Sequence, residues 1–385
     1  MRKYITSPVC SIAMLVALMF FTWCSAIVPT AMAAPATKTS TTPKISWHRA
    51  CSTTTKSGAA YCDALIAYNA STNQTINPLA NPTGGSAPYG PANFHAAYNL
   101  PTTASGTPTV AIVDAYNDPN AASDLATYRS HYGLPACTTA SGCLKIENQT
   151  GGSSLPSSNS GWGLEMSLDL DMVSAICENC HILLVEATTP TIANLGTAVN
   201  TAVAAGAVAV SNSYGGSSGT CSYFNHTYVA ITASTGDSGL GIEYPAACEY
   251  VTAVGGTTLN SSGSETTWSS AGGGCSSVAK PSYEVASVTS CSNRAAGDVS
   301  ADANPSTGAE VYDTYGYSGY LQVGGTSESS PIIAGVYALA GNATTTQYPA
   351  SIAWANYSTG CLYEVSSVRY SYQGGLGSPN GTGCF

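Results

Sequence analysis

The stretch GGTSESSP, residues 324–331, stands directly before the apolar run IIAGV and is the most informative part of this sequence. Its glycine pair allows a tight turn and lets main-chain N–H groups come close to a substrate. Ser327 follows the turn, and Pro331 suits the first turn of a helix, where its missing N–H costs little. A serine beside a helix N-terminus sits in a positive field that favours a nucleophile forming an oxyanion. The alternative is a Ser- and Gly-rich turn that merely precedes a core helix.

The composition describes a chain with very few charges. Of 385 residues, 44% are hydrophobic and only 8% are charged, against about 25% in ordinary globular proteins. The net charge is −10, with 11 lysines and arginines. In acid the carboxylates become neutral, and a chain with few cations then repels itself little. This composition fits an acidic, secreted setting, and the lack of a basic patch argues against nucleic-acid binding.

The first 33 residues have the pattern of a secretory signal peptide. Arg2 and Lys3 precede an apolar run at residues 12–21, and the small residues Ala31 and Ala33 offer a cleavage site. The apolar run is short for a bilayer span, although an uncleaved membrane anchor is the alternative. We therefore expect a secreted, extracellular protein with no membrane attachment once the signal is removed.

Fourteen cysteines minus two in the signal leave twelve, an even number that predicts disulfides in an exported protein. Cys177 and Cys180 also have the spacing of redox and zinc motifs, although the second half of such a motif is missing. Pairing by proximity in the sequence gives Cys51–Cys62, Cys137–Cys143, Cys177–Cys180, Cys221–Cys248, Cys275–Cys291 and Cys361–Cys384.

Residues 34–85 are rich in Ser, Thr, Asn and Pro, and we interpret them as an irregular arm tied by Cys51 and Cys62. A compact domain is expected over residues 86–385, beginning near Tyr89. Short apolar strands alternate there with helices, which predicts an α/β fold with a parallel sheet whose ligands gather at the strand C-terminal ends. The predicted strands are residues 109–113, 181–186, 207–211, 229–233 and 251–254, and the predicted helices are residues 120–131 and 192–205.

Residues 163–177, GLEMSLDLDMVSAIC, predict a largely buried helix that carries two carboxylates on one face. Glu165 and Asp169 are four residues apart, and such a pair normally destabilises a helix. The two groups could share a proton, with one acting as base and the other orienting it. The alternative is a pair that meets Arg or Lys partners, which the scarcity of cations weakens. Asp171 faces elsewhere and has at most an indirect role.

Asp237, in the sequence TGDSG, follows a probable strand. An Asp there commonly caps a turn, but a protonated Asp could instead donate a hydrogen bond to an oxyanion. The five histidines stand in no serine-protease or zinc motif, so we expect structural or surface roles for them. They are His48, His95, His131, His181 and His226.

These motifs resemble the sedolisins, the serine-carboxyl peptidases. The resemblance rests on GGTSESSP, the run from Glu165 to Asp169, and TGDSG followed by YPAACEYVTAVGGT at residues 244–257, which occur in family order. It covers the chain from about residue 89 to the end and implies a subtilisin-like fold, a mostly parallel central sheet flanked by helices, in which Glu replaces the catalytic His. The roles it implies are Ser327 as nucleophile, Glu165 as general base, Asp169 as its partner, Asp237 as oxyanion-hole donor, Asp114 as an additional acid bonded to the pair, and Ser213, Tyr214, Gly215 and Gly216 as the substrate-binding strand end.

The chain departs from the family pattern in two places. Family members often carry a large N-terminal pro-domain, whereas about fifty residues separate signal and catalytic domain here. The family also has a C-terminal calcium loop, for which Glu364 and Val365 replace the usual Asp and its neighbour, and Gln373 stands near the expected second Asp. The resemblance implies calcium at Glu364 and Val365, but calcium prefers six to eight oxygens with several carboxylates, and one Glu plus carbonyls makes a poor site.

The resemblance predicts a secreted endopeptidase that cleaves peptide bonds at acidic pH through a Ser/Glu/Asp triad and an acyl-enzyme. We expect a monomer acting on proteins or peptides. The alternative is a non-catalytic, disulfide-stapled binding or surface protein on the same fold. A subtilisin-type enzyme with His is disfavoured, because no histidine follows the first strand in a Gly-Thr-His context.

Overall fold

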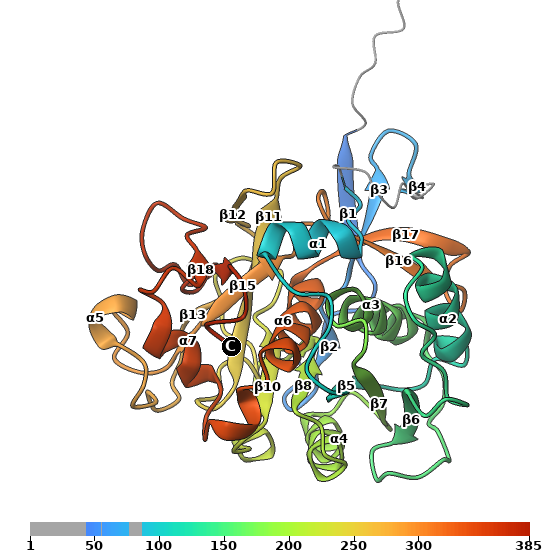
Figure 1. The fold of residues 1–385 in the computed structure, drawn as a ribbon, viewed down its shortest axis with the longest axis horizontal. Coiled ribbons are helices and arrows are strands. Elements are labelled where there is room, and N and C mark those ends of the chain that lie inside the picture. Colours follow the sequence, from blue (N-terminus) through green and yellow to red (C-terminus); the bar gives the residue numbers. More distant parts are fainter. Residues whose placement is uncertain (1–43, 55, 77–86) are drawn as a thin grey trace, which may run out of the picture. The chain divides into compact units, whose positions relative to one another are not determined.

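The apolar strands of the chain build a sheet of eight strands in which all neighbours but one pair are parallel. The computed structural model describes residues 44–54, 56–76 and 87–385 (Figure 1). In order across the sheet the strands are β12 (Glu265–Thr267), β11 (Thr252–Leu259), β10 (Ala230–Ser234), β8 (Ala209–Asn212), β5 (Thr109–Ala115), β7 (His181–Ala187) and β6 (Leu144–Asn148), with β15 (Val299–Asp302) paired to β11 and only β12 antiparallel.

The predicted strands and helices are confirmed to within a few residues at their ends. The two helices predicted between strands are α2 (Ala121–His131) and α4 (Ile192–Ala204). Strand β8 is buried along its whole length, which is typical of a parallel sheet covered on both faces. Shorter elements outside this sheet are α1 (Pro91–Tyr98), α5 (Ala286–Thr289), α7 (Ala350–Asn356), β9 (Tyr214–Gly215), β13 (Gly274–Cys275), β14 (Ala295–Ala296), β18 (Leu362–Tyr363), β19 (Ser378–Pro379) and the short 3-10 helices Cys221–Phe224 and Ala343–Thr345.

Two buried helices, α3 (Ser160–Ile176) and α6 (Thr326–Ala340), contact each other over the sheet (Figure 1). The sequence places Pro331 in the first turn of its helix, and this expectation is wrong, because α6 begins at Thr326 and Pro331 lies inside it. A proline there has no N–H for the carbonyl of Ser327 four residues earlier. The Ser213 hydroxyl lies 3.3 Å from that carbonyl, although its single proton lies closer to Asp169. The helix tolerates the proline, and Ser327 belongs to its first turn.

The N-terminal arm is more ordered than the sequence indicates. Its strands β1 (Ile45–Arg49) and β3 (Leu65–Asn69) pair antiparallel, and β3 continues onto β17 (Gly319–Gly324) in a second sheet. This differs from the expected irregular arm over residues 34–85 and places residues 44–76 in the same unit as the rest of the described chain. The other strands of this region are β2 (Tyr61–Cys62), β4 (Gln74–Thr75) and β16 (Ala309–Asp313). The predicted signal peptide lies outside the described residues.

The twelve cysteines beyond the predicted signal form the six disulfides expected from their proximity in the sequence. The pairs are Cys51–Cys62, Cys137–Cys143, Cys177–Cys180, Cys221–Cys248, Cys275–Cys291 and Cys361–Cys384. Cys177 and Cys180 are fully buried and bonded to each other, which leaves no thiolate for zinc. Within the part of the chain that the structure describes, no helix is long and apolar enough to cross a bilayer.

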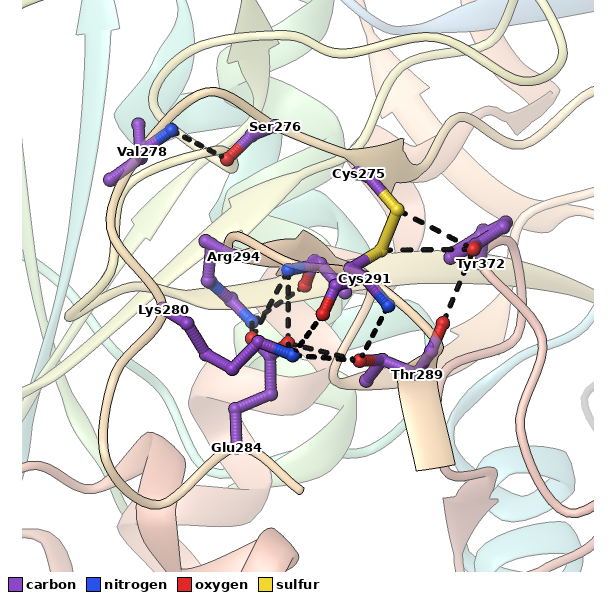
Figure 2. Close-up of a disulfide and its surroundings, with 10 residues drawn as sticks. Cys275, Ser276, Val278, Lys280, Glu284, Thr289, Cys291, Arg294 and Tyr372 are labelled. Atoms are coloured by element: carbon purple, nitrogen blue, oxygen red, sulfur yellow. Dashed lines mark hydrogen bonds and ion pairs between the residues drawn. A yellow bond between two sulfur atoms is a disulfide. The ribbon is translucent and has the colours of Figure 1, made fainter. Parts of the chain in front are cut away.

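A buried cation organises the segment that the Cys275–Cys291 disulfide closes. Figure 2 shows Glu284 between Lys280 and Arg294, close to that disulfide. Arg294 has no exposed surface and donates to Glu284 at 3.2 Å and to Asp298 at 2.8 Å. Burial alone would lower the pKa of Arg294, but Asp298 and its hydrogen bonds raise it, so the guanidinium stays charged. The Trp354 indole also donates to Asp298, at 2.7 Å, which ties α7 to this cluster.

We expect Arg294→Leu to destabilise the fold by about 3–5 kcal/mol, because it leaves the buried Asp298 without its cation and leaves Glu284 with Lys280 alone. Urea unfolding followed by tryptophan fluorescence measures this loss. Arg369→Leu is the control, since Arg369 pairs with a mostly exposed Glu364, and its effect should stay within about 1 kcal/mol. Equal effects of the two substitutions would show that the buried cation has no special role.

Candidate functional site

The helix that carries the paired carboxylates is fixed at its start by an N-cap. The Asn159 side chain accepts hydrogen bonds from the backbone N–H groups of Gly161 at 3.0 Å and Trp162 at 3.1 Å. An N-cap of this kind satisfies donors that a helix end would otherwise leave unpaired. The helix is buried along almost its whole length, as its apolar sequence predicts. Glu165 and Asp169, one turn apart, therefore both point into the protein interior.

Ser327 and Glu165 meet in a direct hydrogen bond. The Ser327 hydroxyl donates to Glu165 Oε2 at 2.8 Å, and both side chains are fully buried. The same hydroxyl also lies 3.1 Å from the carbonyl oxygen of Ser213, so its single proton has two competing acceptors. Among the described residues, neither an ion pair nor a histidine reaches this contact. A hydroxyl bonded to a carboxylate is the geometry that a serine needs to lose its proton.

Asp169 lies behind Glu165, and Ser213 holds it in place. The Ser213 hydroxyl donates to the two carboxylate oxygens of Asp169 at 2.7 and 2.9 Å. Burial, together with the charges of Asp169 and Asp114, raises the pKa of Glu165 well above its usual range. Burial also raises the pKa of Asp169 and of Asp114. The three carboxyl groups therefore cannot all be ionised at the same time. The expected hydrogen bond from Asp114 to the pair is not formed between the described residues, and Asp114 acts on the pair through its charge.

Asp237 faces the start of α6 from another strand end. Its Oδ1 accepts hydrogen bonds from the backbone N–H of Thr326 at 2.7 Å and from the Thr326 hydroxyl at 2.9 Å. Its Oδ2 is buried and accepts no hydrogen bond from the residues that the structure describes. Burial, reinforced by the charge of Asp63, raises the pKa of Asp237 well above its usual range. A proton on this carboxyl therefore belongs on Oδ2, where it is free to be donated.

The turn before the helix explains why this region needs glycine. Gly325 precedes Thr326 with a φ of 102°, a conformation that residues with a side chain rarely adopt. A Cβ atom there would lie 1.9 Å from the Asp63 carbonyl oxygen and 2.8 Å from Asp237 Oδ2. The Gly-Gly turn thus admits another backbone to the space beside Ser327, as the sequence predicts.

The expected substrate-binding strand end, Ser213 to Gly216, is buried and already pairs with another segment of the chain. Tyr214 and Gly215 form β9, which runs antiparallel to β2. A Cβ atom on Gly216 would lie 2.5 Å from the carbonyl oxygen of Ala59, so glycine is required for this close approach. Peptides that bind by strand addition pair with a main-chain edge such as residues 213–216, and here β2 takes that place.

Sequence reasoning missed two charged residues of the site, Arg49 and Asp63. Asp63 is fully buried, and its carboxylate accepts from the Ser234 hydroxyl at 2.9 Å and from Arg49 at 3.3 Å. Arg49 also lies 3.9 Å from Asp237 Oδ2. Both residues stand in the N-terminal arm, and 171 residues separate Asp63 from Ser234, so the local sequence contains no signal for their place in the site.

The residues expected to hold calcium do not fit that ion. The Glu364 carboxylate is mostly exposed and pairs with Arg369 at 2.8 Å. The carbonyl oxygen of Val365 accepts from the backbone N–H and the hydroxyl of Thr267, at 2.8 and 3.0 Å. The side chain of Gln373 donates to a backbone carbonyl instead of ligating. Within the described residues, no three Asp, Glu, His or Cys side chains gather as metal ligands.

The comparisons with known proteins agree with this geometry. Residues 157–357 match the model of the subtilase family. Sedolisin of Pseudomonas sp. (strain 101) is 34% identical over 162 residues, which are 37% of this chain and 27% of that protein. Xanthomonalisin of Xanthomonas sp. (strain T-22) is 33% identical over 176 residues, which are 38% of this chain and 21% of that protein. The matched part thus spans about a quarter of the length of these two relatives.

A solved structure extends the likeness over most of the chain. It is Pseudomonas sedolisin, a serine-carboxyl proteinase, in complex with two molecules of pseudo-iodotyrostatin. The TM-score is 0.63 at 26% sequence identity, and the match covers 77% of this chain and 96% of that one. The family model, the two relatives and this structure agree that the chain belongs to the subtilase family and is a sedolisin-like member of it.

Proposed function

We propose that this protein is a secreted serine-carboxyl endopeptidase that works in acid, as a monomer, on protein or peptide substrates. The observation that carries the proposal is the 2.8 Å hydrogen bond from the Ser327 hydroxyl to Glu165, in a site without histidine among the described residues. The low content of charged residues and the six disulfides fit an acidic extracellular setting.

The reaction would begin when Ser327 attacks a peptide carbonyl carbon. Glu165 Oε2 takes the hydroxyl proton and later gives it to the departing amine, so one carboxyl acts first as base and then as acid. An ester on Ser327 remains and is hydrolysed by water. Asp169 would act on Glu165 through its charge, since no hydrogen bond joins the two carboxyl groups among the described residues, and Ser213 fixes the orientation of Asp169. The raised pKa of Glu165 suits it to donate the proton back.

Asp237 would stabilise the oxyanion. Because Thr326 occupies Oδ1, the acid proton on Oδ2 is available to the developing negative charge on the substrate oxygen. A neutral carboxyl at a working pH above about 4 requires a raised pKa, and burial provides it.

One observation favours the alternative of a non-catalytic binding protein on the same fold. Ser327 has no exposed surface, so a substrate cannot reach it in this arrangement. An enzyme must open the site, whereas a binding protein need not. Activity measurements on the intact chain, after incubation in acid, distinguish the two.

Ser327→Ala should leave the protein folded and secreted but lower the rate of hydrolysis of a denatured protein by at least about 1,000-fold. The measurement follows acid-soluble fragments over pH 2–8. Ser329→Ala is a matched control on the same helix, because the Ser329 hydroxyl only donates to the Thr326 carbonyl at 2.9 Å. Wild-type rates for Ser327→Ala would remove the assignment of the nucleophile.

Asp237→Asn keeps a donor but loses the titration, so we expect it to be much less active and to lose its remaining activity less steeply toward neutral pH. Wild-type kcat/KM should be greatest in acid and decline as pH rises, because Asp237 donates only while it carries its proton. Profiles of kcat/KM from about pH 2 to 8 for both proteins test this. A wild-type optimum at neutral or alkaline pH would exclude the serine-carboxyl mechanism.

The stability of the fold should fall as pH rises from about 4 to 8. Burial raises the pKa of Asp118 to about 7 and that of Glu186 to about 8. A raised carboxyl pKa means that the folded protein binds more protons than the unfolded chain, so stability is complete below about pH 4 and is lost as pH climbs. We expect Tm, measured in Ser327→Ala to prevent self-digestion, to drop across this range.

Glu186→Gln should reduce that drop, whereas Glu364→Gln, at an exposed position, should leave it unchanged. A Tm that rises toward neutral pH would contradict the assignment of these buried carboxyls as protonated.

A further inference from the structure

The site described above is closed by part of its own chain. Ser327, Glu165 and Asp169 have no exposed surface. The covering segment is residues 58–64, which connect β1 to β3. A peptidase that accepts protein substrates needs an open cleft, so the position of this segment requires an explanation beyond packing.

The covering segment lies in the cleft as an added strand. On one side, Tyr61 pairs antiparallel with Gly215, and Cys62 pairs with Tyr214. On the other side, the Ala60 N–H donates to the Pro190 carbonyl at 2.7 Å. An extended backbone with main-chain partners on both edges is how proteins bind peptides by strand addition.

One further main-chain bond on each side extends this strand. The Gly58 carbonyl accepts from the Ile192 N–H at 2.9 Å, and the Asp63 N–H donates to the Ser213 carbonyl at 3.3 Å. Residues 58–63 thus follow the cleft from the start of α4 to the site of Ser327. The pairing uses the strand end that the family resemblance assigns to substrate.

The peptide bond that follows, Asp63–Ala64, lies across the reactive groups. The Ala64 N–H donates to Glu165 Oε2 at 3.0 Å, and this oxygen also accepts from Ser327. The Asp63 carbonyl oxygen lies against Gly325 on the side of Asp237 Oδ2. The carbonyl therefore faces the group proposed to hold the oxyanion, and the amide nitrogen faces the group proposed to protonate the leaving amine. A bond about to be cut needs these two contacts together.

Side chains anchor the covering segment on both sides of this bond. The Tyr61 hydroxyl donates to Glu243 at 2.7 Å, and Asp63 is held by Ser234 and Arg49. Arg49 also lies over the Tyr61 ring, 5.3 Å from its centre. The segment therefore presents one defined bond to Ser327, in one register.

We propose that residues 58–64 are an internal substrate that blocks the cleft until Ser327 cuts the Asp63–Ala64 bond of its own chain. This inference rests on the proposed function. Ser327 Oγ bonds to the Asp63 carbonyl carbon while its proton passes to Glu165 and then to the Ala64 nitrogen, which leaves as a new amino terminus. Water then hydrolyses the Asp63 ester, which restores Ser327 and leaves a carboxylic acid on Asp63.

The Cys51–Cys62 disulfide fits this role. Both cysteines precede the cut, so cleavage leaves the piece ending at Asp63 with no disulfide to the remainder of the described chain. The piece can leave once its strand contacts break. Until then the closed loop restricts the covering segment and lowers the entropy cost of keeping it in the cleft.

The test follows the purified wild-type chain at pH 3–5 by intact mass, amino-terminal sequencing and hydrolysis of a denatured protein. We expect a new terminus at Ala64, with activity that rises from a lag in step with this cut. The rate should not depend on protein concentration, because the bond is presented within one molecule. Ser327→Ala should stay intact. Full activity from a chain with an intact Asp63–Ala64 bond would overturn the inference while leaving the proposed function standing.

Hydrogen–deuterium exchange of Ser327→Ala measures whether the covering segment is docked, in a variant that cannot cut its own chain. The amides of Ala60, Asp63 and Ala64 should exchange slowly, as buried strand amides do. Rapid exchange at these three amides would overturn the inference whatever the activity proves to be.

Cys51→Ser/Cys62→Ser should lengthen the lag at least about fivefold, because a loosened covering segment presents the Asp63–Ala64 bond to Ser327 less often. The matched control is Cys137→Ser/Cys143→Ser, whose short loop precedes the edge strand β6 and lies beside the start of β7. This control should leave the lag unchanged. If the wild type neither cuts itself nor hydrolyses protein, the comparison of these two double variants tests the proposed function separately from self-cleavage. Ser327-dependent activity of the loosened variant then keeps the proposed function and rejects self-cleavage, and its absence rejects both.

Discussion

The burial of carboxyl groups without cations is the constraint on which this structure depends. Glu165, Asp169 and Asp114 lie together with no exposed surface, and no lysine or arginine of the described chain pairs with them. Buried carboxylates of one sign cannot all ionise, so they keep protons to higher pH than free acids do. In a second buried cluster, by contrast, Arg294 pairs with the carboxylates of Glu284 and Asp298. The buried cation thus neutralises carboxylates that stabilise the fold, and Glu165 pairs with no cation among the described residues.

Most of the sheet could be predicted from the sequence because its signals are local. Each parallel strand is a short apolar run, and the paired acids of α3 stand four residues apart on an apolar helix. Proximity also sufficed for the disulfides, since no pair is separated by more than 27 residues. The contact of Ser327 with Glu165 was accessible only through family resemblance, because 162 residues separate them and no local pattern records such a contact.

The features that the sequence did not predict depend on residues far away in the chain. The strands of the arm are short, and β3 finds its neighbour β17 about 250 residues later, so local periodicity could not reveal their pairing. The start of α6 was misplaced because Pro331 usually marks a first turn. In this chain Pro331 lies inside the helix, and the Ser213 hydroxyl lies beside the carbonyl that the proline leaves without a helical partner. Calcium was expected from the position of Glu364, but Arg369 and Thr267 already satisfy the available oxygens.

Acid would act on the covering segment and on Asp237 in the same direction. Burial raises the pKa of Asp63 to about 6, although Arg49 and Ser234 oppose the shift, and Asp237, Glu243 and Tyr61 also face this corner of the site. The docked strand therefore prefers a protonated Asp63, and its docking weakens as pH rises through about 6. Protonation of Asp237, whose pKa burial also raises, is needed for the oxyanion. A low pH thus holds the Asp63–Ala64 bond in place and keeps the proton on Asp237, while Glu165 takes the Ser327 proton only when it is ionised. Cleavage of the docked segment is therefore expected in the acidic range where Asp237 is protonated and some Glu165 is ionised.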